Sequence, residues 1–230
     1  MTDPAAIVDA AMTTRRSVRA FLPKPVPRAV VEEILDIAAR APSGTNMQPW
    51  RVHALAGAPL TAFCDAIEGT FLAGDHGEVR EYKYYPDEFF EPYLSRRRQV
   101  GFAMYDLLSI KRGEAEKMKA QHAQNFRFFG APVGLICTID KRLNVGSWLD
   151  YGFFLGNICT AVRGRGLDTI PQAAFASLPN AIRAALNLPD QEAIVCGMAI
   201  GYADPDATIN QLRTPRAPAS EFTRFAGFAD

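Results

Sequence analysis

Three arginines and a serine lie close together near the start of the chain, in the run Thr-Arg-Arg-Ser-Val-Arg-Ala-Phe of residues 14–21. Arginine guanidinium groups offer paired N–H donors in a fixed geometry, which suits the oxygens of a phosphate. A serine adds a hydroxyl or a backbone N–H. The run therefore predicts a site for a compact anion at Arg15, Arg16, Ser17 and Arg19, with a solvated basic turn as the alternative.

A second polar run, Ala-Pro-Ser-Gly-Thr-Asn-Met-Gln-Pro-Trp, occupies residues 41–50. Its hydroxyl and amide side chains can donate to and accept from a polar ligand. The presence of two such runs favours a binding site over a solvated turn. The candidate binding residues of the second run are Pro42, Ser43, Gly44, Asn46 and Gln48.

The charge of the chain is balanced, with 25 lysines and arginines against 25 aspartates and glutamates. A chain without net charge or a basic stripe is not expected to bind nucleic acid. Hydrophobic residues make up 48% and charged residues 22%, as in ordinary globular enzymes. No window of about 18 residues is continuously apolar, so we expect no membrane-spanning helix.

Four cysteines, Cys64, Cys137, Cys159 and Cys196, lie far apart in the sequence. Two of them stand in apolar runs, where a cysteine behaves as a small buried hydrophobe. We therefore expect reduced thiols and a cytoplasmic location, since the first residues also lack the pattern of a signal peptide. Histidines and cysteines show no metal-ligand spacing, so no metal site is expected.

The elements that must position the two polar runs follow from hydrophobic spacing and from prolines. Helices are expected over residues 4–14, 28–41, 59–69, 94–126, 148–166 and 180–188. Strands are expected over residues 50–56, 131–140 and 193–202, and a turn leads into residues 170–175. This pattern predicts one α+β domain over residues 1–230, with helices around a mixed central sheet. Because the helix at 148–166 is apolar nearly all round, it should lie at the centre of the molecule or of a dimer.

Four further motifs follow the two polar runs. They are Phe-Phe-Gly-Ala-Pro-Val from residue 128, Gly-Leu-Asp-Thr-Ile-Pro from residue 166, and a strand ending Gly-Met-Ala-Ile-Gly-Tyr-Ala, followed by Arg-Thr-Pro-Arg at 213–216. Taken in this order over about residues 10–225, the motifs resemble the nitroreductase family of FMN-dependent oxidoreductases. The resemblance implies a nitroreductase-like fold and an intertwined homodimer that binds FMN at the subunit interface. Residues 69–127 would form a substrate-pocket insertion, and residues 205–230 an arm that crosses to the partner.

The resemblance also implies roles for single residues. Arg15, Arg16 and Ser17 would hold the FMN phosphate and ribityl chain, and Arg19 would reach the pyrimidine edge of the flavin. Arg216, and less strongly Arg213, would also contact the phosphate.

Two segments would complete the flavin site. The loop with Pro42, Ser43, Gly44, Asn46 and Gln48 would approach the flavin from the partner subunit. The backbone of Pro171, Gln172, Ala173 and Ala174 would lie against the flavin and offer N–H groups to N5 and O4. Ala173 stands where well-known bacterial members have a glutamate followed by a glycine, so that side chain is missing here while the backbone contact is unaffected.

An aromatic segment precedes the long predicted helix. Its candidate substrate-binding residues are Tyr82, Tyr84, Tyr85, Phe89 and Phe90. Flat rings of this kind would stack against a small aromatic electrophile over the flavin. The alternative is a hydrophobic flap that packs on a neighbouring subunit. The cationic run at 96–98 is interpreted as a solvated helix face.

The implied reaction is ping-pong hydride transfer through flavin N5, with NADH or NADPH as the donor. A nitroaromatic compound would then be reduced to nitroso and hydroxylamine products. No side chain is assigned as catalytic, because the flavin carries the chemistry. The alternatives are reduction of another electrophile on the same fold, such as an enone, a quinone, free flavin or a halophenol, and flavin binding without catalysis.

Overall fold

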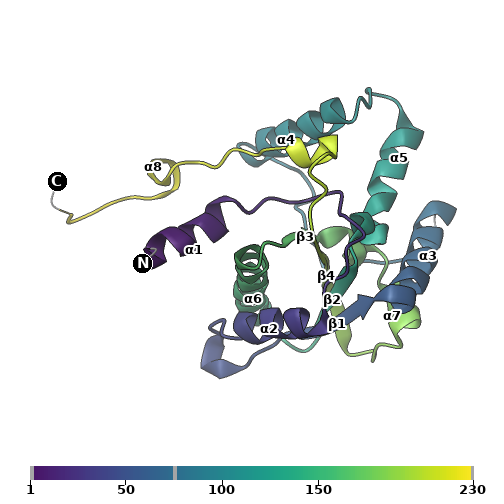
Figure 1. The fold of residues 1–230 in the computed structure, drawn as a ribbon, viewed down its shortest axis with the longest axis horizontal. Coiled ribbons are helices and arrows are strands. Elements are labelled where there is room, and N and C mark those ends of the chain that lie inside the picture. Colours follow the sequence, from purple (N-terminus) through teal and green to yellow (C-terminus); the bar gives the residue numbers. More distant parts are fainter. Residues whose placement is uncertain (1–2, 75–76, 229–230) are drawn as a thin grey trace.

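The computed structural model describes residues 3–74 and 77–228 (Figure 1). Residues 1–2, 75–76 and 229–230 lie outside this description, so both ends of the predicted domain and short parts of the predicted insertion and arm do too. A four-stranded sheet lies at the centre of the body, with helices on both of its faces. The α+β fold predicted from the sequence is confirmed.

The sheet contains β1 (Arg51–Ala56), β2 (Val133–Asp140), β4 (Glu192–Gly201) and β3 (Asp168–Gln172), in that spatial order. All three pairings between these strands are antiparallel. The parallel pairing expected of a mixed sheet is confined, in the described residues, to an isolated bridge between Ser17 and Thr169. β2 and β4 are buried along their whole length because helices cover both faces.

One face of the sheet is covered by α2 (Arg28–Ala38) and α6 (Val145–Gly164). α2 buries the stripe Val31, Ile34 and Ala38, which has the spacing of an amphipathic helix. The ring of Phe154 on α6 stacks on that of Trp50, with centroids 4.8 Å apart. α2 ends three residues before the predicted end, and α6 begins three residues before the predicted start.

The other face is covered by α3 (Gly57–Ala73), α7 (Pro179–Leu186) and two 3₁₀ segments, η2 (Gln124–Gly130) and η3 (Ala173–Ser177). Phe128 and Phe175, one from each 3₁₀ segment, stack with ring centroids 4.6 Å apart. They lie over Gly134 and Gly197 of the sheet, where an added Cβ would overlap these rings. The two glycines therefore make room for the aromatic layer.

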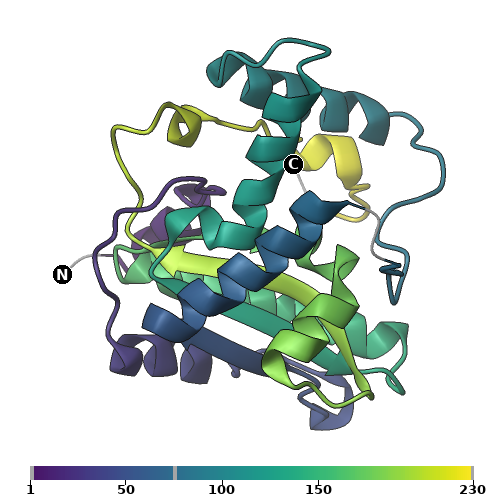
Figure 2. The same cartoon turned by 90° about the vertical axis from the view of Figure 1, so that its right-hand side faces the viewer.

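α4 (Tyr93–Leu107) lies across the top of the molecule, and α5 (Ala115–Ala123) descends from it toward the sheet (Figures 1 and 2). The predicted continuous helix over residues 94–126 is wrong, because a turn separates α4 from α5. Ser109 and Gly113 have positive φ angles in this turn, which a helix cannot accommodate.

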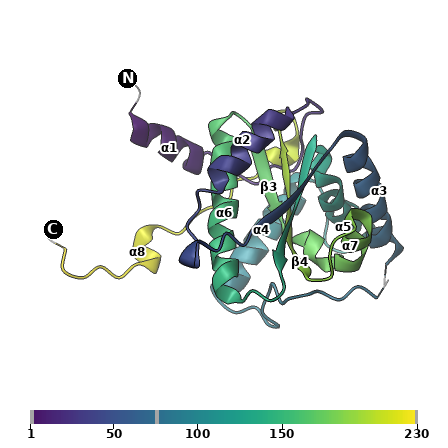
Figure 3. The same cartoon turned by 90° about the horizontal axis from the view of Figure 1, so that it is seen from below.

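The terminal segments project from the body on the side of α6, as Figures 1 and 3 show. Neither α1 (Pro4–Thr13) nor α8 (Ala219–Phe222) has a buried residue. Two further short elements complete the order: η1 (Gly44–Asn46) and η4 (Thr208–Gln211). Among the helices in the described ranges, none combines the length and apolarity needed to cross a membrane. All four cysteines are buried free thiols.

Candidate active site

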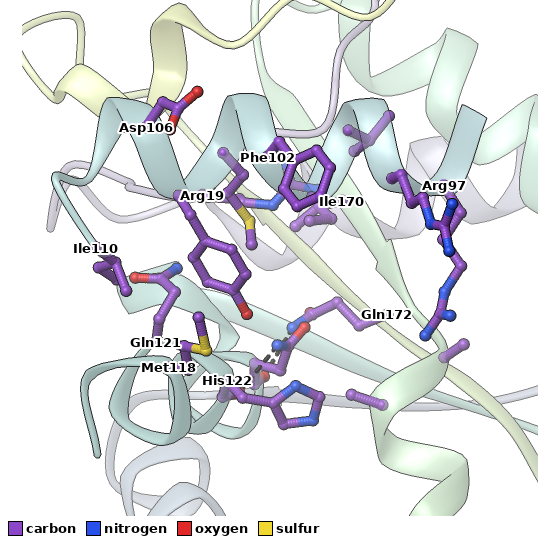
Figure 4. Close-up of a pocket in the computed structure, with 18 of the residues that line it drawn as sticks. Arg19, Arg97, Phe102, Asp106, Ile110, Met118, Gln121, His122, Ile170 and Gln172 are labelled. Atoms are coloured by element: carbon purple, nitrogen blue, oxygen red, sulfur yellow. Dashed lines mark hydrogen bonds between the residues drawn. The ribbon is translucent and has the colours of Figure 1, made fainter. Parts of the chain in front are cut away.

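A large cavity, with a volume of 1360 Å³, lies between the α4–α5 region and the end of β3 (Figure 4). Its floor is made by β3 and the start of η3, from Ile170 to Ala174. α4 forms the roof and α5 one wall, while Arg19 and Tyr85 reach it from separate segments. The cavity therefore brings together six of the predicted site residues: Arg19, Tyr85, Pro171, Gln172, Ala173 and Ala174.

Arg19 is held in place through its backbone. Its backbone N–H donates to Asn210 Oδ1 at 2.8 Å, and Asn210 Nδ2 donates to the carbonyls of Ala20 and Asp204. The guanidinium donates to the Ser17 carbonyl at 3.3 Å, and burial lowers its pKa. Asn210, itself 4% exposed, is a positioning residue that sequence reasoning missed, because an asparagine in an irregular tail gives no pattern to detect.

Arg15, Arg16 and Ser17 form a short edge beside β3. Ser17 bridges Thr169, and the next backbone N–H, that of Val18, donates to the Thr169 carbonyl at 3.4 Å. Arg16 Nε is buried and has no hydrogen-bond acceptor among the described residues. Leaving a buried donor unpaired costs about 1–3 kcal/mol. An anion brought here by a ligand would pair it.

A second unpaired atom lies in the cavity floor. Gln172 is buried, and its Nε2 donates to the Asn125 carbonyl at 2.7 Å. Its Oε1 has no donor within the described part of the chain. The floor thus carries one free acceptor, and the neighbouring arginine run carries one free donor.

The loop at residues 42–48 does not line this cavity within one chain. Its backbone is tied to α6 and to itself: Gly44 N–H donates to Asp150 Oδ2 at 3.0 Å, and Gln48 N–H donates to Ser43 Oγ at 3.0 Å. Asn46 and Gln48 have positive φ angles and are exposed. The side chains of Asn46 and Gln48, like Pro42, are therefore open to solvent in the single chain.

The C-terminal arginines also lie away from the large cavity. Arg213 donates to the Asn210 and Leu212 carbonyls. Arg216 lies in a separate hollow of 480 Å³ between α4 and the arm, which Arg96 also lines. Within one chain, neither Arg213 nor Arg216 lines the large cavity.

The aromatic segment is only partly at the cavity. Tyr85 lines the large cavity, whereas Tyr82 and Tyr84 line an adjacent one of 580 Å³ that shares Pro171 and Ala173 with it. Phe89 and Phe90 line neither of them.

Tyr82 fastens this segment to the sheet. Its hydroxyl donates to the Val195 carbonyl at 2.6 Å, its ring lies 4.5 Å from that of Trp148, and burial raises its pKa well above the ordinary value. Beside it, Glu81 accepts from Arg183 and from the Ile194 N–H. Two adjacent side chains thus fix where the aromatic segment begins.

Several cavity residues were not predicted. The run at 96–98 is exposed on α4, as predicted for a solvated helix face, and Arg97 and Arg98 also line the cavity, which was not predicted. Of that run, Arg96 instead approaches Glu221 of the arm at 3.8 Å. His122 lines the wall from α5, and burial together with the charge of Arg80 lowers its pKa. The run of three arginines was the sequence signal for these cavity residues. The sequence could not tell which of the three side chains would face the cavity.

Comparisons with known proteins show the family and the fold of the chain. The model of the family described as "Nitroreductase family" matches residues 12–202. A 4-nitrobenzoate reductase of Pseudomonas putida is 44% identical over 220 residues, which cover 96% of each chain. The crystal structure of an FMN and NADPH-dependent nitroreductase, NfnB from sphigopyxis sp. strain HMH, superposes with a TM-score of 0.92 at 38% identity, covering 96% of this chain and 99% of that one.

The structure of the FMN-dependent nitroreductase NfnB from Mycobacterium smegmatis in complex with NADPH gives a TM-score of 0.93 at 28% identity and covers 98% of this chain and 100% of that one. The fold predicted by the resemblance is therefore confirmed. The chain belongs to the nitroreductase family.

Proposed function

We infer that this protein is an FMN-dependent NAD(P)H oxidoreductase that reduces nitroaromatic compounds. The observation that carries this function is the cavity at the end of β3, where a half-buried arginine and the segment Ile170 to Ala174 face a space large enough for a flavin and a substrate. The named activities of the similar proteins, an FMN and NADPH-dependent nitroreductase and a 4-nitrobenzoate reductase, support the same assignment.

The unpaired polar atoms fit FMN. Arg16 Nε, with Arg15 and Ser17 beside it, would hold the phosphate, since guanidinium donors pair well with phosphate oxygens. Arg19 would lie at the flavin ring, and the backbone of Gln172 to Ala174 would support it from the floor. When bound, FMN accepts two electrons as a hydride from the nicotinamide donor and passes them to the substrate.

The overall reaction balances in two-electron steps. A nitro compound, one NAD(P)H and one proton give a nitroso compound, NAD(P)⁺ and water. The nitroso compound, a second NAD(P)H and a second proton give the hydroxylamine and NAD(P)⁺. The chain's own residues bind and orient the reactants, and water can supply the protons.

The functional unit is a homodimer. Single-chain exposure supports this assembly: Leu149 and Phe153 on α6 are 65% and 48% exposed, and the apolar residues of α1 and of the arm are also uncovered. The loop at 42–48 would then reach the flavin site of the partner, and residues 205–230 would act as the crossing arm. Residues 69–127 would form the substrate-pocket insertion of a single domain located in the cytoplasm.

A spectrum of the purified protein tests the cofactor and the donor. We expect FMN to be retained or taken up, and its visible band to bleach when NADPH or NADH is added without oxygen. Arg16→Ala should weaken FMN binding by about tenfold, since one charge-assisted hydrogen bond contributes about 1.5 kcal/mol. A protein that takes up no FMN at all would contradict the proposed function.

A further inference from the structure

The lining of the large cavity is strongly unbalanced in charge. The cations that line it are Arg19, Arg80, Arg97, Arg98, Lys111 and Arg112, whereas the one carboxylate among the described lining residues is Asp106. The chain as a whole has no net charge. The excess of positive charge is therefore local to this cavity.

The charges are also separated along the cavity. Asp106 lies near the end of α4, eight residues after Arg98, which corresponds to about 12 Å along a helix axis. Figure 4 shows Arg97 and Asp106 at opposite ends of the roof helix. Arg80, Arg97 and Arg98, here named the arginine end, thus have no carboxylate beside them in the lining.

The ion pairs of the described residues leave the arginine end without a counter-charge. In the part of the chain that the structure describes, none of its three guanidinium groups forms an ion pair within 4.0 Å. Two carboxylates close in sequence are paired with other cations: Glu81 with Lys141 and Arg183, and Asp87 with Lys83. Within the described residues, Glu88 and Glu91 form no ion pair with Arg80, Arg97 or Arg98. The donors of the arginine end are therefore available to a ligand.

Aromatic rings help to hold one of these arginines. The guanidinium carbon of Arg97 lies 4.4 Å from the ring centroid of Phe89 and 6.0 Å from that of Tyr85. A stacked guanidinium keeps its N–H edges free to bind a carboxylate. Tyr85, Phe102 and Phe129 line the same cavity and offer surface for a flat ring.

We propose that the arginine end selects nitroaromatic substrates that carry a carboxylate over neutral nitroaromatics of the same shape. The proposal rests on the proposed function, since it names the substrate class of the same site. Arg97 and Arg98 bind the carboxylate, and Arg80 adds to the positive potential around it. Arg19 takes no part, because it serves the flavin ring.

A competing source of negative charge is the nicotinamide donor, whose phosphates could bind the same arginines. The two half-reactions separate these sources. Reduction of the holoprotein by NADPH involves the donor alone. Reoxidation of the reduced holoprotein involves the nitro compound alone.

The test compares 4-nitrobenzoate with its neutral counterpart 4-nitrobenzamide in Arg97→Gln, Arg98→Gln and the double variant. We expect the rate constant for reoxidation by 4-nitrobenzoate, divided by its half-saturating concentration, to fall about tenfold for one lost charge-assisted hydrogen bond. The value for 4-nitrobenzamide and the rate of reduction by NADPH should change by less than about twofold. Lys117→Gln is the matched control, because Lys117 is a cation on α5 that pairs with Glu114 and does not line the cavity.

Binding measured by calorimetry without any donor gives a readout apart from turnover. Oxidised wild-type holoprotein should bind 4-nitrobenzoate more tightly than 4-nitrobenzamide, and the double variant should lose that preference. Equal affinity of the wild type for the two compounds would overturn the proposal. So would variants that slow reduction by NADPH and leave the preference for the acid intact. If neither compound reoxidises the protein, the proposed function fails, while the binding preference still decides this proposal.

Discussion

Arg19 illustrates how single residues of the site depend on distant parts of the chain. Its position in the cavity follows from Asn210, which is nearly two hundred residues away and holds the backbone at residues 19 and 20. The sequence predicted the arginine, because its side-chain chemistry is visible in the run at 14–21. It could not predict the asparagine, because a buried amide that pairs with backbone leaves no periodic signal.

Replacing Arg19 should separate catalysis from cofactor retention. A cation at the pyrimidine edge stabilises the anionic reduced flavin more than the oxidised one. Arg19→Gln should therefore slow reduction by NADPH about tenfold, which corresponds to about 1.4 kcal/mol, with a smaller change in the Kd for FMN. Stopped-flow absorbance and equilibrium titration measure the two quantities. An unchanged reduction rate would show that Arg19 does not act on the flavin ring.

The buried carboxylate of Glu192, at the start of β4, makes stability depend on pH. Burial raises the pKa of Glu192. Hydrogen bonds from Thr138, Arg51 and His53 lower the pKa by more than burial raises it, so the net pKa lies below the ordinary value. A carboxylate whose folded pKa is lowered stabilises the fold above its unfolded pKa, about 4.3, and loses this contribution as pH falls through the folded value.

Glu192→Gln should therefore unfold more readily than the wild type at pH 7, by about 1–3 kcal/mol, since one or more of its buried partners is left poorly paired. The difference between the two proteins should shrink below about pH 4.3. Urea unfolding at a series of pH values checks this. A difference that is constant from pH 7 to pH 3 would mean that the Glu192 charge has no special role.

At the scale of elements, hydrophobic spacing predicted most of the helices and strands. The prediction from hydrophobic spacing failed where the backbone conformation of single residues ends a helix. The turn after Leu108, with positive φ angles at Ser109 and Gly113, splits the helix predicted over residues 94–126. Just beyond that range, Phe128 and Phe129 also have positive φ angles. Phenylalanine rarely adopts a left-handed backbone. Its presence there follows from tertiary packing against Phe175, which the sequence pattern does not contain.

The close approach of this aromatic layer to the sheet gives a sharp prediction. Gly197→Ala places a Cβ against the ring of Phe175, deep in the core. Overpacking of this kind costs about 1–3 kcal/mol. Gly69→Ala on α3 is the control, because an added Cβ meets nothing within 4 Å there and alanine favours a helix by up to about 1 kcal/mol. Thermal unfolding should rank Gly69→Ala at or above the wild type, and the reverse order would refute the packing argument.

At the scale of the whole molecule, a single chain leaves many large apolar side chains exposed to solvent. The rings of Phe222, Phe225 and Phe228 in the arm are 61–77% exposed, and α6 presents an uncovered face although its other side lies in the core. Exposed apolar surface of this extent marks an interaction site. The sequence predicted the apolar helix and the dependent tail, but the intertwined dimer itself came from the resemblance.

Leu149→Glu should break the proposed homodimer, because it adds a charge to the exposed face of α6 and leaves the core of the single chain untouched. Light scattering should give twice 25.2 kDa for the wild type and 25.2 kDa for the variant. The variant should also lose FMN. Leu72→Glu on α3, across the sheet, should remain dimeric and retain FMN. A wild-type protein with a mass of 25.2 kDa in solution would be a monomer, which would contradict a flavin site formed by two subunits.

The most direct test of the proposed function is a product balance under anaerobic conditions. The holoprotein is supplied with NADPH and a limiting amount of 4-nitrobenzoate, and the product is identified by mass. We expect two molecules of NADPH to be consumed for each nitro compound and the hydroxylamine to accumulate, as the two-electron steps require. A protein that NADPH reduces but that only an enone, a quinone or a halophenol reoxidises would contradict the assignment as a nitroaromatic reductase.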